Sequence, residues 1–277
     1  MSETPPPTVT VNRPPSGIEL PDVGALWRDR ELFYFLAWRD VRVRYKQTAL
    51  GAAWAVLQPV ITMLIFTFVF GRVAGLAPEG VPYSIFVYTA LVPWTFFSTA
   101  ITQAAQSLVL QERILTRVHF PRILIPMAAI AAVLVDLAVT LPVLGVLLVV
   151  HGIAPGWAIV TLPLFVLLVV LAASAVGLWL GAINVRYRDV RYVTPFLVQL
   201  WFFITPIVYS ADVVPSRWRI LLELNPLVAV VDGFRWAVLD ADAPGRSLIV
   251  AVVVVAVGLT AALFHFRRLE ATFADEV

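Results

Sequence analysis

The residue types that carry out most enzyme chemistry are sparse and scattered in this chain. The phosphate-binding loop of ATP hydrolases, G-x-x-x-x-G-K-[ST], does not occur, and the single lysine, Lys46, does not follow glycine in that pattern. There is no cysteine, and the three histidines are too widely spread along the sequence to predict a metal site. Asp240 and Asp242 form a D-x-D pair, which some glycosyltransferases use to hold a metal-bound sugar nucleotide. We interpret that pair as chance, and expect no catalytic residue, metal or cofactor in this chain.

One carboxylate stands within a long apolar stretch. Asp136 lies inside residues 123–150, which carry no other charged side chain. An isolated charge in lipid costs several kcal/mol, so an acid at this depth is a functional hypothesis by default. Three roles are open for Asp136: a structural pair across a helix interface, a role along a transport path, or proton coupling. The third has little support, because a single acid forms no relay.

Aromatic residues are dense in the apolar stretches. Their flat faces can stack on the C–H faces of sugar rings, so that a polar polymer slides without deep, specific hydrogen-bond wells. Packing in the core or against lipid is the alternative for each of them. The candidate translocation-channel residues are Trp54, Phe66, Phe70, Trp94, Phe97, Trp201, Phe202 and Tyr209.

Composition indicates the kind of element that must position these residues. The chain has 277 residues, of which 60% are hydrophobic and 14% charged, well below the charged fraction of a soluble domain. An apolar helix of roughly 20 residues spans a bilayer. We therefore predict an all-α integral membrane protein with six transmembrane helices, within residues 51–268. The six candidate spans cover residues 52–71, 83–104, 123–150, 156–183, 193–210 and 247–266.

The arginines predict the orientation of these spans. They gather before the first span, in the second and fourth connections, and after the last span. Because Lys and Arg in short loops stay on the cytoplasmic side, we place both termini in the cytoplasm. Residues 1–24 are polar and proline-rich, with no apolar core of a signal peptide, and are expected to form a disordered cytoplasmic tail. Residues 269–277 form a second cytoplasmic tail in this interpretation.

Two segments outside the spans have distinctive patterns. Residues 25–50 mix arginine with aromatic and aliphatic residues, which predicts an amphipathic helix at the membrane interface or a simple juxtamembrane anchor. Residues 211–246 contain two apolar pieces too short to span, interrupted at Asn225-Pro226 and Asp232-Gly233. They predict an external re-entrant helical hairpin, with a plain external loop as the alternative. Gly177-x-x-x-Gly181 adds a small-residue stripe that lets another helix approach closely.

Several strings, in consistent order over about residues 30–268, resemble the membrane subunits of ABC-2 type exporters. The likeness is to the polysaccharide, O-antigen and teichoic-acid export permeases. The first string is WRDVRVRYKQTALGAAW at residues 38–54, followed by Gln58-Pro59. The second is RILTRVHFPR at residues 113–122, ending in Ile125-Pro126. The third group comprises RYRDV at 186–190, TPIVY at 205–209, Asn225-Pro226 and Arg235.

This resemblance implies a homodimer in the bacterial plasma (inner) membrane, docked on two copies of a separate nucleotide-binding subunit that holds ATP and Mg²⁺. The pair would export a lipid-linked glycan, contact membrane lipid and bind no nucleic acid. Residues 111–122 correspond to the family's cytoplasmic coupling helix, and residues 211–246 would form the external gate. The implied coupling residues are Arg113, Ile114, Arg117, Val118, His119, Phe120 and Arg122, with Arg39, Arg42 and Arg44 on the interface helix. The implied gate residues are Asn225, Pro226 and Arg235.

Other functions remain open from the sequence. An ABC-2 exporter of a drug or small lipid would share the fold, although such exporters tend to lack this combination of strings. A secondary transporter or channel would need no ATPase. A membrane glycosyltransferase would depend on Asp240 and Asp242.

Overall fold

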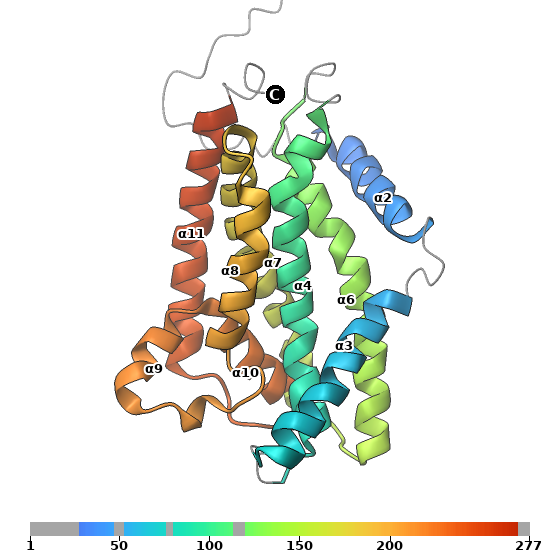
Figure 1. The fold of residues 1–277 in the computed structure, drawn as a ribbon, viewed down its shortest axis with the longest axis vertical. Coiled ribbons are helices and arrows are strands. Elements are labelled where there is room, and N and C mark those ends of the chain that lie inside the picture. Colours follow the sequence, from blue (N-terminus) through green and yellow to red (C-terminus); the bar gives the residue numbers. More distant parts are fainter. Residues whose placement is uncertain (1–27, 47–52, 76–79, 113–119, 271–277) are drawn as a thin grey trace, which may run out of the picture.

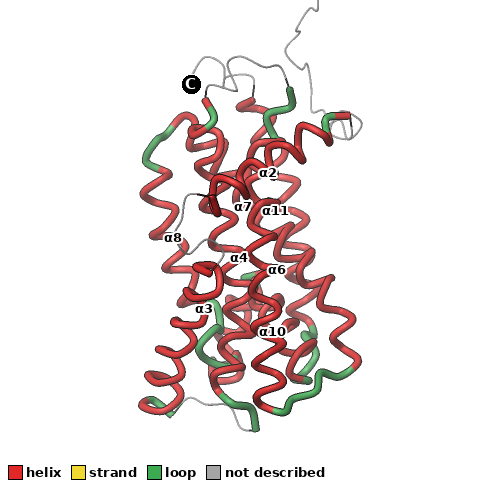
Figure 2. Tube along the Cα trace, turned by 90° about the vertical axis from the view of Figure 1, so that its right-hand side faces the viewer, coloured by secondary structure: helices red, strands yellow, loops and turns green. Residues whose placement is uncertain are grey.

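The computed structural model describes residues 28–46, 53–75, 80–112 and 120–270. Within these ranges the regular structure is helical throughout, and most helices run lengthwise in one elongated bundle (Figures 1 and 2). We call the end at which α11 finishes the upper end, as in Figure 1, and the opposite end the lower end. Residues 1–27, with the predicted N-terminal tail, and residues 47–52, 76–79, 113–119 and 271–277 lie outside the described residues. The first two residues of the predicted C-terminal tail, Leu269 and Glu270, belong to α11.

Five helical segments are long and apolar enough to cross a membrane, by length and composition. Each has a mean hydropathy between 1.4 and 2.8 in its most apolar window, and none carries more than two charged residues there. This agrees with the all-helical membrane architecture expected from the sequence. The segments are α3 with the π-helical η1 (Ala53–Val73), α4 (Tyr83–Leu110), α6 (Leu124–His151), η2 with α7 (Trp157–Arg186) and α11 (Arg246–Glu270).

The sixth apolar helix, α8 (Val190–Ile204), is shorter than the sequence suggested. It has 15 residues, about 22 Å at 1.5 Å per residue, against a hydrocarbon core of about 30 Å. The expected span over 193–210 continues past the point where the helix ends. Pro206 is the physical reason, because a residue before proline avoids the helical region, and Thr205 is extended at ψ 134°.

Helix α4 is the central element. It lies between α8 and α3 in Figure 1, and other helices bury most of its side chains. The glycine stripe of α7 packs against it: a Cβ on Gly177 would come within 2.7 Å of the Ala104 Cβ, and one on Gly181 within 3.0 Å of the Ala104 carbonyl oxygen. The sequence predicted that the glycine stripe lets another helix approach closely, and that helix is α4.

The first described helix, α2 (Arg30–Lys46), flanks the upper part of the bundle (Figure 1). Leu36 is buried against the start of α6 and the end of α11, where Ile125 and Phe266 lie. Tyr34, Phe35, Trp38 and Val43 are exposed apolar side chains on the same helix. A helix with one packed face and exposed aromatic residues suits a membrane interface.

The lower end is closed by short elements between α8 and α11. A 3-10 turn, η3 (Ala211–Val213), precedes α9 (Ser216–Glu223), and α10 (Pro226–Leu239) follows. Figure 2 shows α10 low within the bundle, and most of its side chains are buried. Trp236 of α10 contacts Trp157 and Phe165 edge-on, with ring centroids 5.6 and 6.2 Å apart. The α10 helix is thus packed into the bundle and is not a loose loop.

Candidate functional site

Six of the eight candidate channel aromatics form one connected cluster. Their rings meet in sequence from Phe70 to Phe66, Phe202, Trp94, Phe97 and Trp201, with centroids 5.0–6.0 Å apart. The cluster joins η1 and α3 to α4 and α8, which are far apart in the sequence. Edge-on and tilted contacts of this kind stabilise beyond the area they bury. We call these six residues the aromatic cluster.

Exposure divides the aromatic cluster into two layers. Phe97 and Trp94 are buried, with 0% and 7% of their surface exposed, whereas Phe66, Phe70, Trp201 and Phe202 are half-buried. The buried pair packs the core, as the alternative interpretation held. The half-buried rings keep faces free on the outside of the described chain, where a sugar could stack.

The other two candidate channel residues lie apart from the cluster. Trp54 is 54% exposed at the start of α3 and lines a polar cavity between α2, α4 and α6. Tyr209 lies beyond the end of α8, and its hydroxyl donates hydrogen bonds to the carbonyls of Phe203 and Ile204 at 3.3 and 3.4 Å. Tyr209 therefore closes the last turn of α8 in this structure.

Asn225 links the end of α8 to the start of α10. Its Oδ1 accepts the Leu227 backbone N–H at 3.1 Å, which caps α10, and also accepts the Trp201 indole N–H at 2.9 Å. Its Nδ2 donates to the Thr205 Oγ1 at 3.0 Å. Pro226 takes the first helical position, where a backbone N–H has no acceptor within the helix, so proline loses no hydrogen bond there. The Asn-Pro step is thus a helix start tied to the aromatic cluster.

Arg235 is the most deeply buried cation among the described residues, with 4% of its surface exposed. Its Nη2 donates to the Ile207 carbonyl at 3.0 Å, and its Cζ lies 3.6 Å from the Phe86 ring centroid. The Asp232 Oδ1 is 4.0 Å from its Nη1. Burial raises the pKa of Asp232, while the Arg235 charge acts in the opposite direction. Together with the Tyr83 hydroxyl, which donates to the Val208 carbonyl at 2.6 Å, these contacts hold residues 205–209 against α4 and α10.

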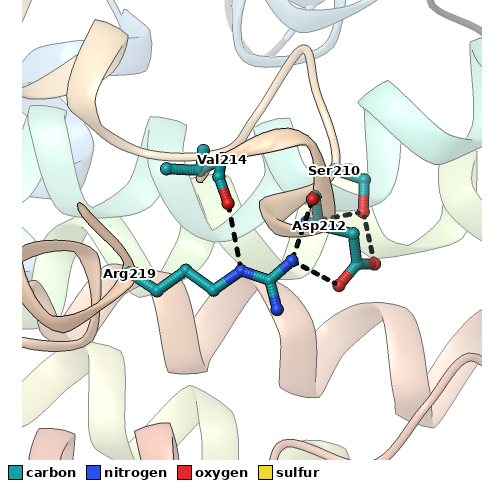
Figure 3. Close-up of polar contacts among 4 residues, drawn as sticks. All are labelled: Ser210, Asp212, Val214 and Arg219. Carbon is teal, nitrogen blue, oxygen red and sulfur yellow. Dashed lines mark hydrogen bonds and ion pairs between the residues drawn. The ribbon is translucent and has the colours of Figure 1, made fainter. Parts of the chain in front are cut away.

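Arg219 shows a contrasting arrangement at the same end of the molecule (Figure 3). Its Nε donates to the Val214 carbonyl at 3.1 Å and its Nη2 to the Asp212 carbonyl at 2.9 Å. The Asp212 carboxylate is 3.8 Å away, and Ser210 donates to that carboxylate at 3.0 Å. All of these side chains are exposed or half-exposed, so Arg219 clamps a surface turn.

Asp136 is paired. Near the middle of α6, it forms an ion pair with Arg44 and accepts a hydrogen bond from the Tyr45 hydroxyl, both at the end of α2. Burial, followed by the hydrogen bond to Asp136, raises the pKa of Tyr45, so the phenol stays protonated and donates. The structure therefore shows the pairing that was one of the three open roles, and Arg44, an implied coupling residue, is held by this pair with 24% of its side chain exposed.

The implied coupling residues are described only in part. Arg113, Ile114, Arg117, Val118 and His119 lie outside the described residues. Phe120 packs at the upper end against the cluster that contains Leu36 and Phe266. The Arg122 backbone N–H donates to the Glu270 carboxylate at 2.9 Å, and its guanidinium donates to the Glu270 carbonyl at 2.6 Å. On α2, Arg39 pairs with Asp40 at 2.8 Å and Arg42 lies 5.5 Å from the Trp38 ring centroid.

Sequence reasoning missed the partners of the charged groups. Tyr45, Tyr83 and Phe86 were not singled out, although each contacts a predicted site residue or holds its surroundings. The available signal was weak: a tyrosine next to Arg44, and aromatic residues at the start of a predicted span. Pairing across the bundle depends on the fold and not on local pattern.

Comparison with known proteins decides the family. The profile of the family described as ABC-2 type transporter matches residues 31–239, from α2 to the end of α10. This chain belongs to the ABC-2 type transporter family. The ABC-2 match includes every candidate site residue named above, and α11 follows it.

Several relatives of this ABC-2 chain have names that describe a transport function. An O-antigen export system permease protein of Myxococcus xanthus is 30% identical over 261 residues, covering 92% of this chain and 98% of the relative. A protein of the same description from Klebsiella pneumoniae is 27% identical, covering 88% and 94%. A polysialic acid transport protein of Escherichia coli is 24% identical, covering 73% and 78%.

Proposed function

We propose that this chain is the permease subunit of an ATP-driven exporter that moves a lipid-linked polysaccharide from the cytoplasm to the outer face of a bacterial inner membrane. The observation that carries the proposal is the near full-length match to O-antigen export permeases, which covers almost all of both chains. The half-buried rings of the aromatic cluster support it, because they are partly exposed at the surface of the bundle and aromatic faces stack on sugar rings.

In this proposal the chain crosses the membrane six times, with α8 completing the sixth crossing and the upper end in the cytoplasm. Exposed arginines at the upper end support this orientation, since cytoplasmic loops retain Lys and Arg. Three of them lie where α7 ends and α8 begins: Arg186, Arg188 and Arg191. Both termini then lie inside, and α9 with α10 forms the external re-entrant hairpin that gates the outer mouth.

The motor is a separate subunit, since the chain has no phosphate-binding loop. Two permease chains dock on two nucleotide-binding subunits, which carry ATP and Mg²⁺. ATP-driven closure of those subunits moves the permease only if they bind its two states with different affinity. Residues 111–122 and the exposed face of α2 provide the contact surface in this proposal.

Deletion of the gene in its own host tests the function. Export predicts that lipid-linked precursor is still made and accumulates inside the cell, while surface polysaccharide is lost. A membrane glycosyltransferase predicts lost synthesis and no accumulation. Export that persists when the Walker lysine of the neighbouring ATPase is replaced would contradict the ATP-driven mechanism and indicate a secondary transporter. Normal surface polysaccharide after deletion would point to a drug or small-lipid exporter.

A further inference from the structure

Two polar cavities lie end to end beside α4. The inner one, of about 220 Å³, is enclosed by α2, α3, α4 and α6. The outer one, of about 760 Å³, lies nearer the upper end, between α2 and α4. Arg44 and Gln103 line both cavities, so the two cavities are neighbours along a path from the upper end toward the middle of the bundle. We call this path the polar cleft.

A stripe of polar residues on α4 forms one wall of the polar cleft. Thr95, Thr99, Gln103 and Ser107 recur at every fourth position of α4, Gln111 follows directly after the helix, and each of the five lines at least one of the two cavities. Residues four apart lie on one face of a helix. An amide side chain such as Gln103 is costly to expose to lipid, which favours its position at a hydrated cavity.

The charged groups that line the polar cleft carry no excess positive charge, because Asp40, Asp136 and Glu112 outnumber Arg39 and Arg44. Arg44 is paired with Asp136, and Arg39 is paired with Asp40 at 2.8 Å. A phosphate entering the cleft would have to displace a carboxylate from an arginine in an environment of reduced dielectric constant. The uncharged polar groups of the lining are hydroxyls and amides, which alternate with apolar side chains, and the Trp54 ring lines the inner cavity. Hydroxyls and amides both donate and accept hydrogen bonds, as sugar hydroxyls do, and an indole face can cover an apolar sugar face.

We propose that the polar cleft binds uncharged sugar residues of the transported glycan, and that its phosphate-bearing end is held elsewhere. This inference rests on the proposed function, and it adds the substrate chemistry: short stretches of neutral glycan enter beside α4 from the upper end. The Arg44–Asp136 pair positions the end of α2 as the second wall and neutralises the Arg44 charge.

The test measures binding of a phosphate-free probe to the full complex of permease and ATPase in lipid nanodiscs. The probe is oligosaccharide released by mild acid from the surface polysaccharide of the native host, and saturation-transfer NMR reports its contact. The variant Thr99→Val with Gln103→Leu removes two polar groups of the stripe while keeping side-chain shape. The matched control is Thr102→Val with Gln106→Leu, on the same helix and outside both cavities.

The stripe variant should bind the oligosaccharide about tenfold more weakly, as expected from losing two hydrogen bonds, and the control should bind like the unaltered complex. Inorganic pyrophosphate at millimolar concentration should not compete. Equal loss in both variants, competition by pyrophosphate, or no binding to the unaltered complex would each overturn the inference. If only the inference about the cleft is wrong, deletion of the gene still makes lipid-linked precursor accumulate inside the cell. If the proposed function is wrong, the precursor does not accumulate.

Discussion

At the scale of the residue, charge inside this bundle is held by partners from distant segments. Asp136 of α6 meets Arg44 and Tyr45 of α2, and Arg235 of α10 meets Phe86 of α4 and the Ile207 carbonyl. An unpaired charge in a desolvated site costs several kcal/mol. Each of these charged residues can therefore stay buried only while the segment that carries its partner is packed against it. These pairs therefore position the ends of α2 and α10.

A double-mutant cycle measures the Arg44–Asp136 pair. Arg44→Gln and Asp136→Asn should each destabilise the protein by about 2 kcal/mol, because each leaves one charge without its partner in a half-buried site. The double variant should lose less than the sum of the two. Thermal unfolding in detergent checks this, with Arg39→Gln at the neighbouring pair of α2 as control. Strict additivity would show that the two groups do not interact.

The two arginines of the lower end should differ in their contribution to stability. Arg235→Met removes a buried hydrogen bond to Ile207 and leaves Asp232 without its cation, so a loss of about 2 kcal/mol is expected. Arg219→Met affects an exposed clamp and should cost under about 1 kcal/mol. Melting temperatures of the purified variants compare the two. Equal shifts would contradict the difference in burial.

At the scale of the element, close helix approach depends on glycine. A Cβ on Gly233 would lie 2.1 Å from the Phe165 ring, so α10 packs against the start of α7 only because this side chain is absent. Gly177 and Gly181 have the same role between α7 and Ala104 of α4. The approach of α10 brings Asn225 and Arg235 to the segment that follows α8.

Gly233→Ala should therefore displace α10 and destabilise the protein by about 1–3 kcal/mol, as overpacked cores do. Gly145→Ala is the matched control, since a Cβ at that position of α6 meets nothing within 4 Å. Alanine is also the better helix former there, so the control should be neutral or slightly stabilising. Phe165→Leu combined with Gly233→Ala should recover part of the loss. Thermal unfolding and yield of folded protein report all three, and a neutral Gly233→Ala would refute the steric assignment.

At the scale of the whole molecule, the arrangement separates an upper end with exposed arginines from a lower end closed by α9 and α10 (Figure 1). The proposed export direction depends on which end faces the cytoplasm. Because the chain has no native cysteine, single cysteines can report this without background.

Arg188→Cys should react with a membrane-impermeant maleimide only after the cells are permeabilised. Val213→Cys, which replaces an exposed residue of the lower end, should react in intact cells. Surface polysaccharide must be retained in both variants, so that the labelled chains are functional. Labelling of Arg188→Cys in intact cells would show that the upper end faces outward. The surface proposed to contact the ATPase would then lie on the wrong side of the membrane.

The sequence by itself determined the helical membrane class, the positions of the apolar helices and the family. These features are local, because a bilayer requires long apolar runs and because the matching strings keep their order along the chain. It also singled out Asp136, Asn225 and Arg235, since a polar residue in an apolar stretch is visible without a fold.

Only the tertiary structure decided which groups meet. It paired Asp136 with Arg44, joined six aromatic residues from three segments and brought the stripe of α4 to a cleft beside α2. Contacts of this kind join residues far apart in the sequence and depend on how helices pack. Helix packing follows from side-chain shape on both partners at once, which no single stretch of sequence contains.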